Sequence, residues 1–125
     1  MTKYYLFLDD VRQPHNVTWV DMPLHEWTIV RSYKEFRDAI WNLGIPEFVA
    51  YDHDLADVHY SSMNHGEAID YNSLTEKTGY DCAKFLCNEC SKLNAPHPPF
   101  VVHSMNIVGG ENIRKYIAAY NKTVK

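Results

Sequence analysis

The sequence has no apolar run long enough to cross a membrane and no signal-peptide pattern at its N-terminus, where MTKYYLFLDD leads into a short apolar segment. Basic residues form no tract, and the formal net charge is −4 at pH 7. A long nucleic-acid duplex needs a positive footprint, so this partner is disfavoured. A small phosphate ligand stays open, because a few basic groups, backbone N–H groups or a metal can neutralise it. We expect a cytoplasmic protein that acts away from membranes, and its oligomeric state stays open.

Cysteine is scarce, and all three residues, Cys82, Cys87 and Cys90, lie in one expected helix. Cys87 and Cys90 have the C-x-x-C spacing of redox and zinc sites, but no second pair of ligands accompanies them. Together with nearby alanine and leucine residues they recur at helical spacing. We therefore interpret them as buried thiols that act as small apolar side chains.

The chain has enough apolar side chains for a core and is too short for two domains. Of its 125 residues, 46% are hydrophobic and 14% aromatic, which makes disorder implausible. We see no internal repeat and no linker, so residues 1–125 are expected to form one domain.

Short apolar segments alternate with helical patterns along the chain, which indicates an α/β domain with a mostly parallel sheet and flanking helices. Residues 11–26 lack a helical period, so any helix there is short. MNIVGGEN, residues 105–112, is read as a turn before the last helix. Strands are expected at 4–8, 27–31, 48–52 and 100–104, and helices at 32–43, at 78–93 and over the stripe Ile113, Tyr116, Ile117 and Tyr120.

The segment from residue 55 to residue 77 is long, polar and weakly patterned. Loops of this length in compact domains are uncommon and often act as lids or binding loops. His59, Tyr60 and His65 lie in it and would contact a substrate if the segment closes over a site.

Polar side chains follow three of the expected strands at the point where each strand ends. Asp9 and Asp10 follow the first strand, the motif 52–54 (DHD) follows the third, and the motif 103–106 (HSMN) follows the fourth. In open α/β sheets, ligands bind beyond the carboxyl ends of the strands. The sequence therefore predicts a functional site at this edge of the sheet.

Three of these residues, Asp9, Asp10 and Asp52, would bring carboxylates within a few ångströms of one another. Like charges at such distances cannot all stay ionised unless a cation lies among them. Oxygen ligands favour Mg²⁺ or Mn²⁺, which also bind phosphate oxygens. The alternative is that each aspartate caps a helix or turn, but convergence of three favours the metal.

Two histidines occupy matching positions, because His53 and His103 each end an apolar strand. Imidazoles that titrate near neutrality can act as general base and general acid in phosphoester cleavage. We interpret His53 and His103, with Asp54, as catalytic candidates. The histidines could instead complete a metal site, or one could be a core residue.

A phosphate would find further partners nearby. Arg12, two residues after the aspartate pair, is a candidate clamp, although an ordinary surface ion pair is the alternative. Gly109 and Gly110 precede the last helix, where backbone N–H groups can bind an anion, although a turn needs glycine for its own reasons. Ser104 and Asn106 complete the candidate substrate-binding group.

Four motifs together resemble the cyclic-phosphate-processing receiver domains, relatives of response-regulator receivers found in phage and bacterial genomes. The motifs are LFLDDVRQP, YDHDL, TGYDCAKFL and VHSMNIVGGENI, in that order. The resemblance implies a flavodoxin-like α/β fold with an acidic metal pocket, and action on cyclic phosphates in nucleotides or at RNA ends.

The resemblance also assigns residues. Asp9 and Asp10 match the metal-binding acidic pair of receivers, and Asp52 matches the phosphoacceptor position. Ser104 falls near the hydroxyl residue of the fourth receiver strand, whereas the residues His53, Asp54, His103 and Asn106 belong to the cyclic-phosphate pattern. Family members read DHDLG where this chain has Ala56, and neither a fifth strand nor the receiver lysine after it is recognisable.

Three functions follow as hypotheses. The first is a phosphoesterase that uses Mg²⁺ or Mn²⁺ to open a cyclic phosphate in a nucleotide or at a 2′,3′-cyclic end. The second is a protein that binds a cyclic nucleotide without cleaving it, as a phage counter-defence protein would. The third is a degenerate receiver that docks onto a partner protein.

Overall fold

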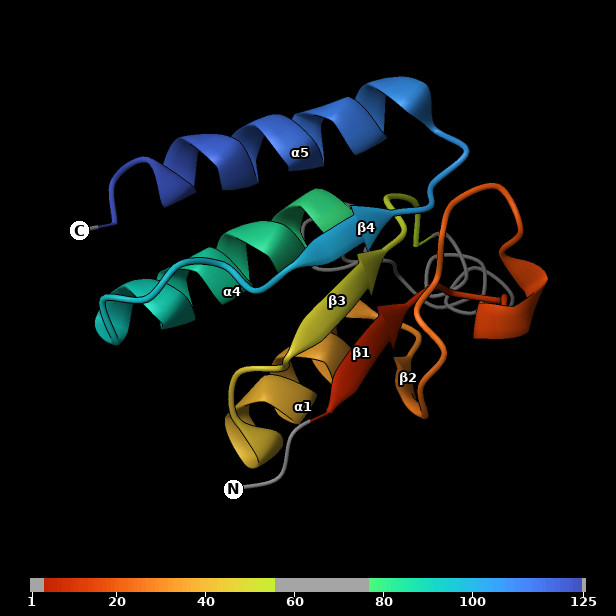
Figure 1. Ribbon diagram of the computed structural model, residues 1–125, viewed down its shortest axis with the longest axis horizontal. Coiled ribbons are helices and arrows are strands. Elements are labelled where there is room, and N and C mark those ends of the chain that lie inside the picture. The colour runs from red at the N-terminus through yellow and green to blue at the C-terminus, as the bar shows by residue number, and fades with distance from the viewer. Residues whose placement is uncertain (1–3, 56–76, 125) are drawn as a thin grey trace, which may run out of the picture.

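The computed structural model of this chain describes residues 4–55 and 77–124, so the segment containing His59, Tyr60 and His65 lies outside the described residues. The described residues confirm the α/β fold, in which one all-parallel sheet is flanked by helices (Figure 1). The elements in chain order are β1 (Tyr5–Leu8), the 3-10 helix η1 (Pro14–Asn16), β2 (Trp27–Val30), α1 (Tyr33–Leu43), β3 (Phe48–Tyr51), α4 (Gly79–Lys92), β4 (Phe100–Val102) and α5 (Ile107–Asn121).

The sheet has the strand order β2-β1-β3-β4, and each expected strand is present with slightly shorter bounds. In the register, Leu8 of β1 lies opposite Tyr51 of β3. The two strands therefore end at the same level, and the residue after each strand lies at the same edge. This register positions the candidate site.

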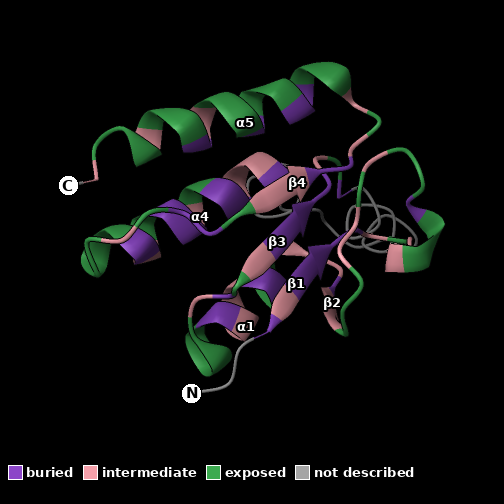
Figure 2. Ribbon diagram, viewed as in Figure 1, coloured by how far each residue is buried: buried purple, intermediate pink, exposed green. Residues whose placement is uncertain are grey.

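The two faces of the sheet are covered differently, because successive side chains of a strand point to opposite faces. Leu6 and Leu8 of β1 face the main core, which contains the buried side chains of α1, α4 and α5. Phe7 faces a smaller cluster with Val17 and Ala50, which the segment before β2 helps to cover. Figure 2 shows the buried strand residues between these coverings. As predicted, the segment 11–26 contains only the short η1.

The helix starts show why the chain folds locally as it does. Ser32 caps α1 by accepting a hydrogen bond from the N–H of Glu35, and Thr78 with Asp81 forms a capping box on α4. The turn expected at residues 105–112 is wrong from residue 107 onward, where α5 begins. Asn106 caps α5, so Gly109 and Gly110 lie in the first turn of this helix.

The cysteine prediction is confirmed. Cys82, Cys87 and Cys90 are free and buried on α4, facing the core. Burial raises the pKa of Cys87 to about 12 and that of Cys90 to about 11, so these thiols are poor nucleophiles at neutral pH. None of the helices that the structure describes is both long and apolar enough to cross a membrane.

Candidate functional site

Asp9, Asp10 and Asp52 meet at the carboxyl edge of the sheet, as the sequence predicts. Each offers one carboxylate oxygen, and these oxygens lie within 4.8 Å of one another. The register of β1 and β3 is the cause, because Asp9 follows Leu8, Asp52 follows Tyr51, and the N–H of Asp52 donates to the Leu8 carbonyl at 3.0 Å. Asp9 and Asp52 are buried, whereas Asp10 is half-buried.

Asp9 is the better stabilised of the two buried carboxylates. Its Oδ1 accepts hydrogen bonds from the N–H groups of Val11 at 2.9 Å and Arg12 at 2.8 Å. Its Oδ2 lies 3.0 Å from Nε2 of His103 and 3.4 Å from Nη1 of Arg12. Burial alone would raise its pKa, but the bonds from His103 and the two backbone groups outweigh burial and hold the pKa of Asp9 below its usual range.

The pKa of Asp52 is shifted in the opposite direction to that of Asp9. Burial, followed by the negative charge of Asp9, raises the pKa of Asp52 to about 6. One hydrogen bond, from the N–H of His53 to Oδ1 at 2.8 Å, opposes this shift. At neutral pH two buried carboxylates therefore carry like charges side by side, an arrangement that a divalent cation would stabilise. The all-oxygen donor set fits Mg²⁺ or Mn²⁺.

The two histidines are not a matched pair, which corrects the expectation from sequence. His103 has no solvent-exposed surface and stacks on Phe7, with ring centroids 4.9 Å apart. Its Nε2 bonds to Asp9, and its buried Nδ1 has no hydrogen-bond partner within the described part of the chain. The enclosed ring therefore contacts Asp9 and has no exposed surface to offer a substrate.

His53 lies in a more open position and belongs to a polar group with Asp54 and Asn106. Its Nδ1 is 2.8 Å from Oδ1 of Asp54, and Nδ2 of Asn106 donates to the same oxygen at 3.2 Å. A carboxylate at this distance favours a proton on Nδ1, and so leaves Nε2 as the basic nitrogen. The structure thus brings Asn106, expected from sequence as a phosphate ligand, into contact with the catalytic candidates His53 and Asp54.

Gly109 and Gly110 do not form the expected anion cradle. The N–H of Gly109 donates to Oδ1 of Asn106 at 2.8 Å, and the N–H of Gly110 donates to the Asn106 carbonyl at 2.8 Å. Both donors are therefore used in starting α5. The real reason for glycine at position 109 is contact, since a Cβ there would lie 2.4 Å from Cγ of His53.

Ser104 and Arg12, two of the three remaining predicted phosphate ligands, lie at the same edge. Ser104 accepts a hydrogen bond from the N–H of Asn106 through Oγ at 3.0 Å. Arg12 is partly exposed, and its Nη1 lies 3.4 Å from Oδ2 of Asp9. Its guanidinium therefore reaches the acidic cluster, as a clamp must.

The sequence did not predict two further residues that make contacts at this edge. Arg31 donates from Nη1 to the carbonyls of Asp9, at 3.1 Å, and Arg12, at 2.5 Å, and so fixes the loop that carries the acidic pair. Trp19 donates from Nε1 to the carbonyl of His103 at 2.8 Å. Arg31 had a usable signal, because it directly follows the strand 27–30. Trp19 had none, because its partner is 84 residues away.

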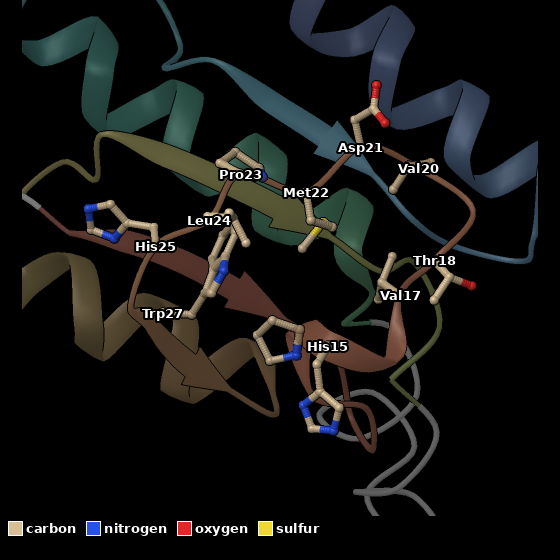
Figure 3. A pocket seen from close by; sticks show the side chains of 11 residues that line it. His15, Val17, Thr18, Val20, Asp21, Met22, Pro23, Leu24, His25 and Trp27 are labelled. Atoms are coloured by element: carbon tan, nitrogen blue, oxygen red, sulfur yellow. The ribbon is translucent and has the colours of Figure 1, made fainter.

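A separate hollow of about 530 Å³ lies between the segment 14–25 and β2 (Figure 3). Its lining is mostly apolar and includes Val20, Met22 and Trp27, with His15 and His25 at its border. None of the predicted site residues lines it, so it is distinct from the acidic cluster.

Comparison with known protein families found a match. The family model described as cyclic-phosphate processing receiver domain matches residues 4–119, nearly the whole chain. Comparisons with curated proteins and with solved structures found no match. The match extends over the acidic cluster, the group around His53 and the start of α5. The chain therefore belongs to the family of cyclic-phosphate-processing receiver domains.

Proposed function

We propose that the protein is a metal-dependent phosphoesterase that opens a cyclic phosphate. The observation that carries this proposal is the convergence of three carboxylate oxygens within 4.8 Å at the end of two adjacent strands. A histidine oriented by a carboxylate lies directly after one of these strands, with 2.8 Å between His53 Nδ1 and Asp54 Oδ1. Family membership supports the cyclic phosphate as the class of substrate.

In this proposal Asp9, Asp10 and Asp52 hold Mg²⁺ or Mn²⁺. Such an ion, when bound, polarises the phosphoryl group and lowers the pKa of a bound water. Arg12 lies against the Asp9 carboxylate and supplies a positive charge for the phosphate oxygens. Nε2 of His103 lies 3.0 Å from the carboxylate of Asp9, and Nη1 of Arg31 donates to the Asp9 carbonyl at 3.1 Å. These two side chains keep Asp9 in place.

His53 serves as the general base. The Asp54 carboxylate and the amide of Asn106 hold the ring, so Nε2 can take a proton from the attacking water. The water oxygen bonds to phosphorus, one P–O bond of the ring breaks, and the leaving oxygen takes a proton from protonated His53 or from solvent. The product is a phosphate monoester in place of the cyclic diester.

The test is a panel of cyclic mononucleotides, cyclic oligonucleotides and RNA with cyclic-phosphate ends, incubated with Mg²⁺ or Mn²⁺ and then with chelator. We expect ring opening over many turnovers with the metal and none with chelator, read by chromatography. Ligand recovered intact from a stoichiometric complex would indicate sequestration instead. Absence of both product and binding would favour the docking function.

Asp52→Asn is the matching variant. Replacing a ligand should lower turnover by more than the roughly 10- to 100-fold typical of losing an outer-shell partner. Mg²⁺ should raise the unfolding temperature of the parent but not of the variant. In chelator at neutral pH the variant should be the more stable protein by about 1–3 kcal/mol, because the ionised buried carboxylate is gone. Asp38→Asn, on the exposed side of α1, is the control, and normal turnover of Asp52→Asn would refute the assignment.

A further inference from the structure

Exposed apolar side chains lie in the two segments that follow β1 and β4 at the carboxyl end of the sheet, where the acidic cluster also lies. Val11 and Trp19 belong to the segment after β1, which also carries Asp9, and both are exposed. Met105, Ile107 and Val108 follow β4 and begin α5, and they are exposed as well. Figure 2 shows the exposed first turn of α5 at the end of the sheet where the strands finish. A concentration of exposed apolar side chains around a polar pocket typically marks a ligand or partner contact.

Trp19 is the one large aromatic side chain among these residues, and it is held in position. Its Nε1 donates to the carbonyl of His103 at 2.8 Å, which ties the ring to the end of β4. The guanidinium carbon of Arg12 lies 5.2 Å from the ring centroid. The same guanidinium reaches Oδ2 of Asp9 at 3.4 Å. The indole, the guanidinium and the acidic cluster are therefore consecutive neighbours.

The indole is also accessible, since 40% of the Trp19 surface is exposed. A tryptophan that is fixed by its polar atom and leaves part of its ring in solvent offers a rigid apolar plane. Aromatic planes of this kind bind nucleobases, because every base has a π face, and each stacked base contributes about 1–3 kcal/mol.

We propose that Trp19 stacks on the nucleobase of a nucleoside cyclic phosphate whose phosphate lies at the acidic cluster. The phosphate position rests on the proposed function, and the stacking names the substrate class more closely. Arg12 lies between the two parts and contacts both, so it couples base binding to the phosphate. Sugar phosphates without a base use only the cluster and Arg12.

The test compares probes with and without a base: the 2′,3′- and 3′,5′-cyclic phosphates of adenosine, methyl ribofuranoside 2,3-cyclic phosphate, and a short RNA ending in a 2′,3′-cyclic phosphate. Dissociation constants and ring opening are measured for the parent, Trp19→Ala, Trp19→Phe and the exposed control Trp41→Ala. Trp19→Ala should weaken binding of base-containing probes by about 5- to 150-fold, the equivalent of one stacked base. Binding of the methyl ribofuranoside should not change, Trp19→Phe should recover most of the affinity, and Trp41→Ala should resemble the parent.

A second readout does not depend on the Trp19 variants folding. In Trp27→Phe/Trp41→Phe the only remaining tryptophan is Trp19. Adenosine probes should quench its fluorescence, and the methyl ribofuranoside should not. The RNA and the mononucleotides distinguish the two sources of a base: a Trp19-dependent affinity for RNA alone identifies an RNA end, and one for mononucleotides identifies a free nucleotide.

Equal binding of adenosine probes by parent and Trp19→Ala would overturn the inference, as would an equal loss for probes with and without a base, or no binding of any probe by the parent. If the parent and Trp19→Ala open the ring at the same rate, the proposed function stands and the stacking does not. Trp19-dependent binding without ring opening would leave the stacking standing without the enzyme.

Discussion

Glycine at position 109 sets how closely α5 approaches His53. A Cβ at this position would lie 2.4 Å from Cγ, 2.6 Å from Cδ2 and 2.7 Å from Nδ1 of the His53 ring. The imidazole therefore rests directly on the helix backbone, with Asp54 and Asn106 at its Nδ1. The position of the His53 ring, the proposed base, therefore depends on the absence of a side chain at Gly109.

Gly109→Ala should displace the His53 ring and destabilise the fold by about 1–3 kcal/mol, the usual cost of overpacking a close contact. Gly110→Ala is the matched control in the same turn, because its Cβ would meet Val102 Cγ1 at 3.3 Å and the flexible Arg114 Nη1 at 3.7 Å. There the gain in helix propensity, up to about 1 kcal/mol, offsets the tight contact. Urea unfolding of both variants measures the difference, and equal stabilities would contradict the packing argument.

At the scale of elements, the start of α5 connects the helix to the site. Asn106 accepts the Gly109 N–H through Oδ1 at 2.8 Å, and its Nδ2 donates to Asp54 at 3.2 Å. One amide therefore both caps the helix and orients the carboxylate that holds His53. These two roles can be separated, because a cap needs only an oxygen close to the backbone.

Asn106→Ser should keep the cap and lose the contact to Asp54, since serine is as good a cap but shorter. We expect the free energy of unfolding to stay within about 0.5 kcal/mol of the parent. The kcat for ring opening should fall by roughly 10-fold or more with KM unchanged, because a poorly oriented His53 loses part of the rate that a general base contributes. Asn106→Ala, which loses the cap too, should also lose about 1 kcal/mol. Parent-like kcat in Asn106→Ser would argue against an orienting role for Asn106.

At the scale of the whole molecule, the end of the sheet opposite the site is held by a buried histidine. Nε2 of His97 lies 2.7 Å from the hydroxyl of Tyr51, and Nδ1 of His97 lies 2.6 Å from the Pro98 carbonyl. Its N–H donates to Asn121 at the end of α5, at 2.9 Å. Burial lowers the pKa of His97 from 6.5 to about 4, so the folded protein keeps this ring neutral over that range.

This shift predicts that His97 contributes a loss of stability as pH falls from about 6.5 to about 4, whereas the raised pKa of Asp52 contributes in the opposite direction over the same range. At His97 the unfolded chain binds a proton in this window and the folded chain does not, so acid favours unfolding by up to roughly 3 kcal/mol from this group. Above the window the contribution is fully present. Urea unfolding across the window should show that His97→Gln gains stability relative to the parent as pH falls, because the Asp52 contribution is common to both, and a difference that does not change with pH would contradict this origin.

Much of the fold follows from local pattern. The four strands and the capped starts of α1 and α4 were predictable, because side-chain periodicity and capping act within a few residues. The meeting of Asp9, Asp10 and Asp52 was predictable too, because parallel strands place the residues that follow them at one edge. The burial of the α4 cysteines follows from the same helical period.

The tertiary structure alone decided what distinguishes residues of the same type. His53 and His103 look equivalent along the chain, yet one lies against Gly109 and the other is enclosed beside Asp9. Asp9 and Asp52 also look alike, but their pKa values move in opposite directions. Trp19 reaches the site through the carbonyl of His103, which follows β4 and is 84 residues away in the sequence. Such differences arise from burial and from contacts between distant residues, which local periodicity does not encode.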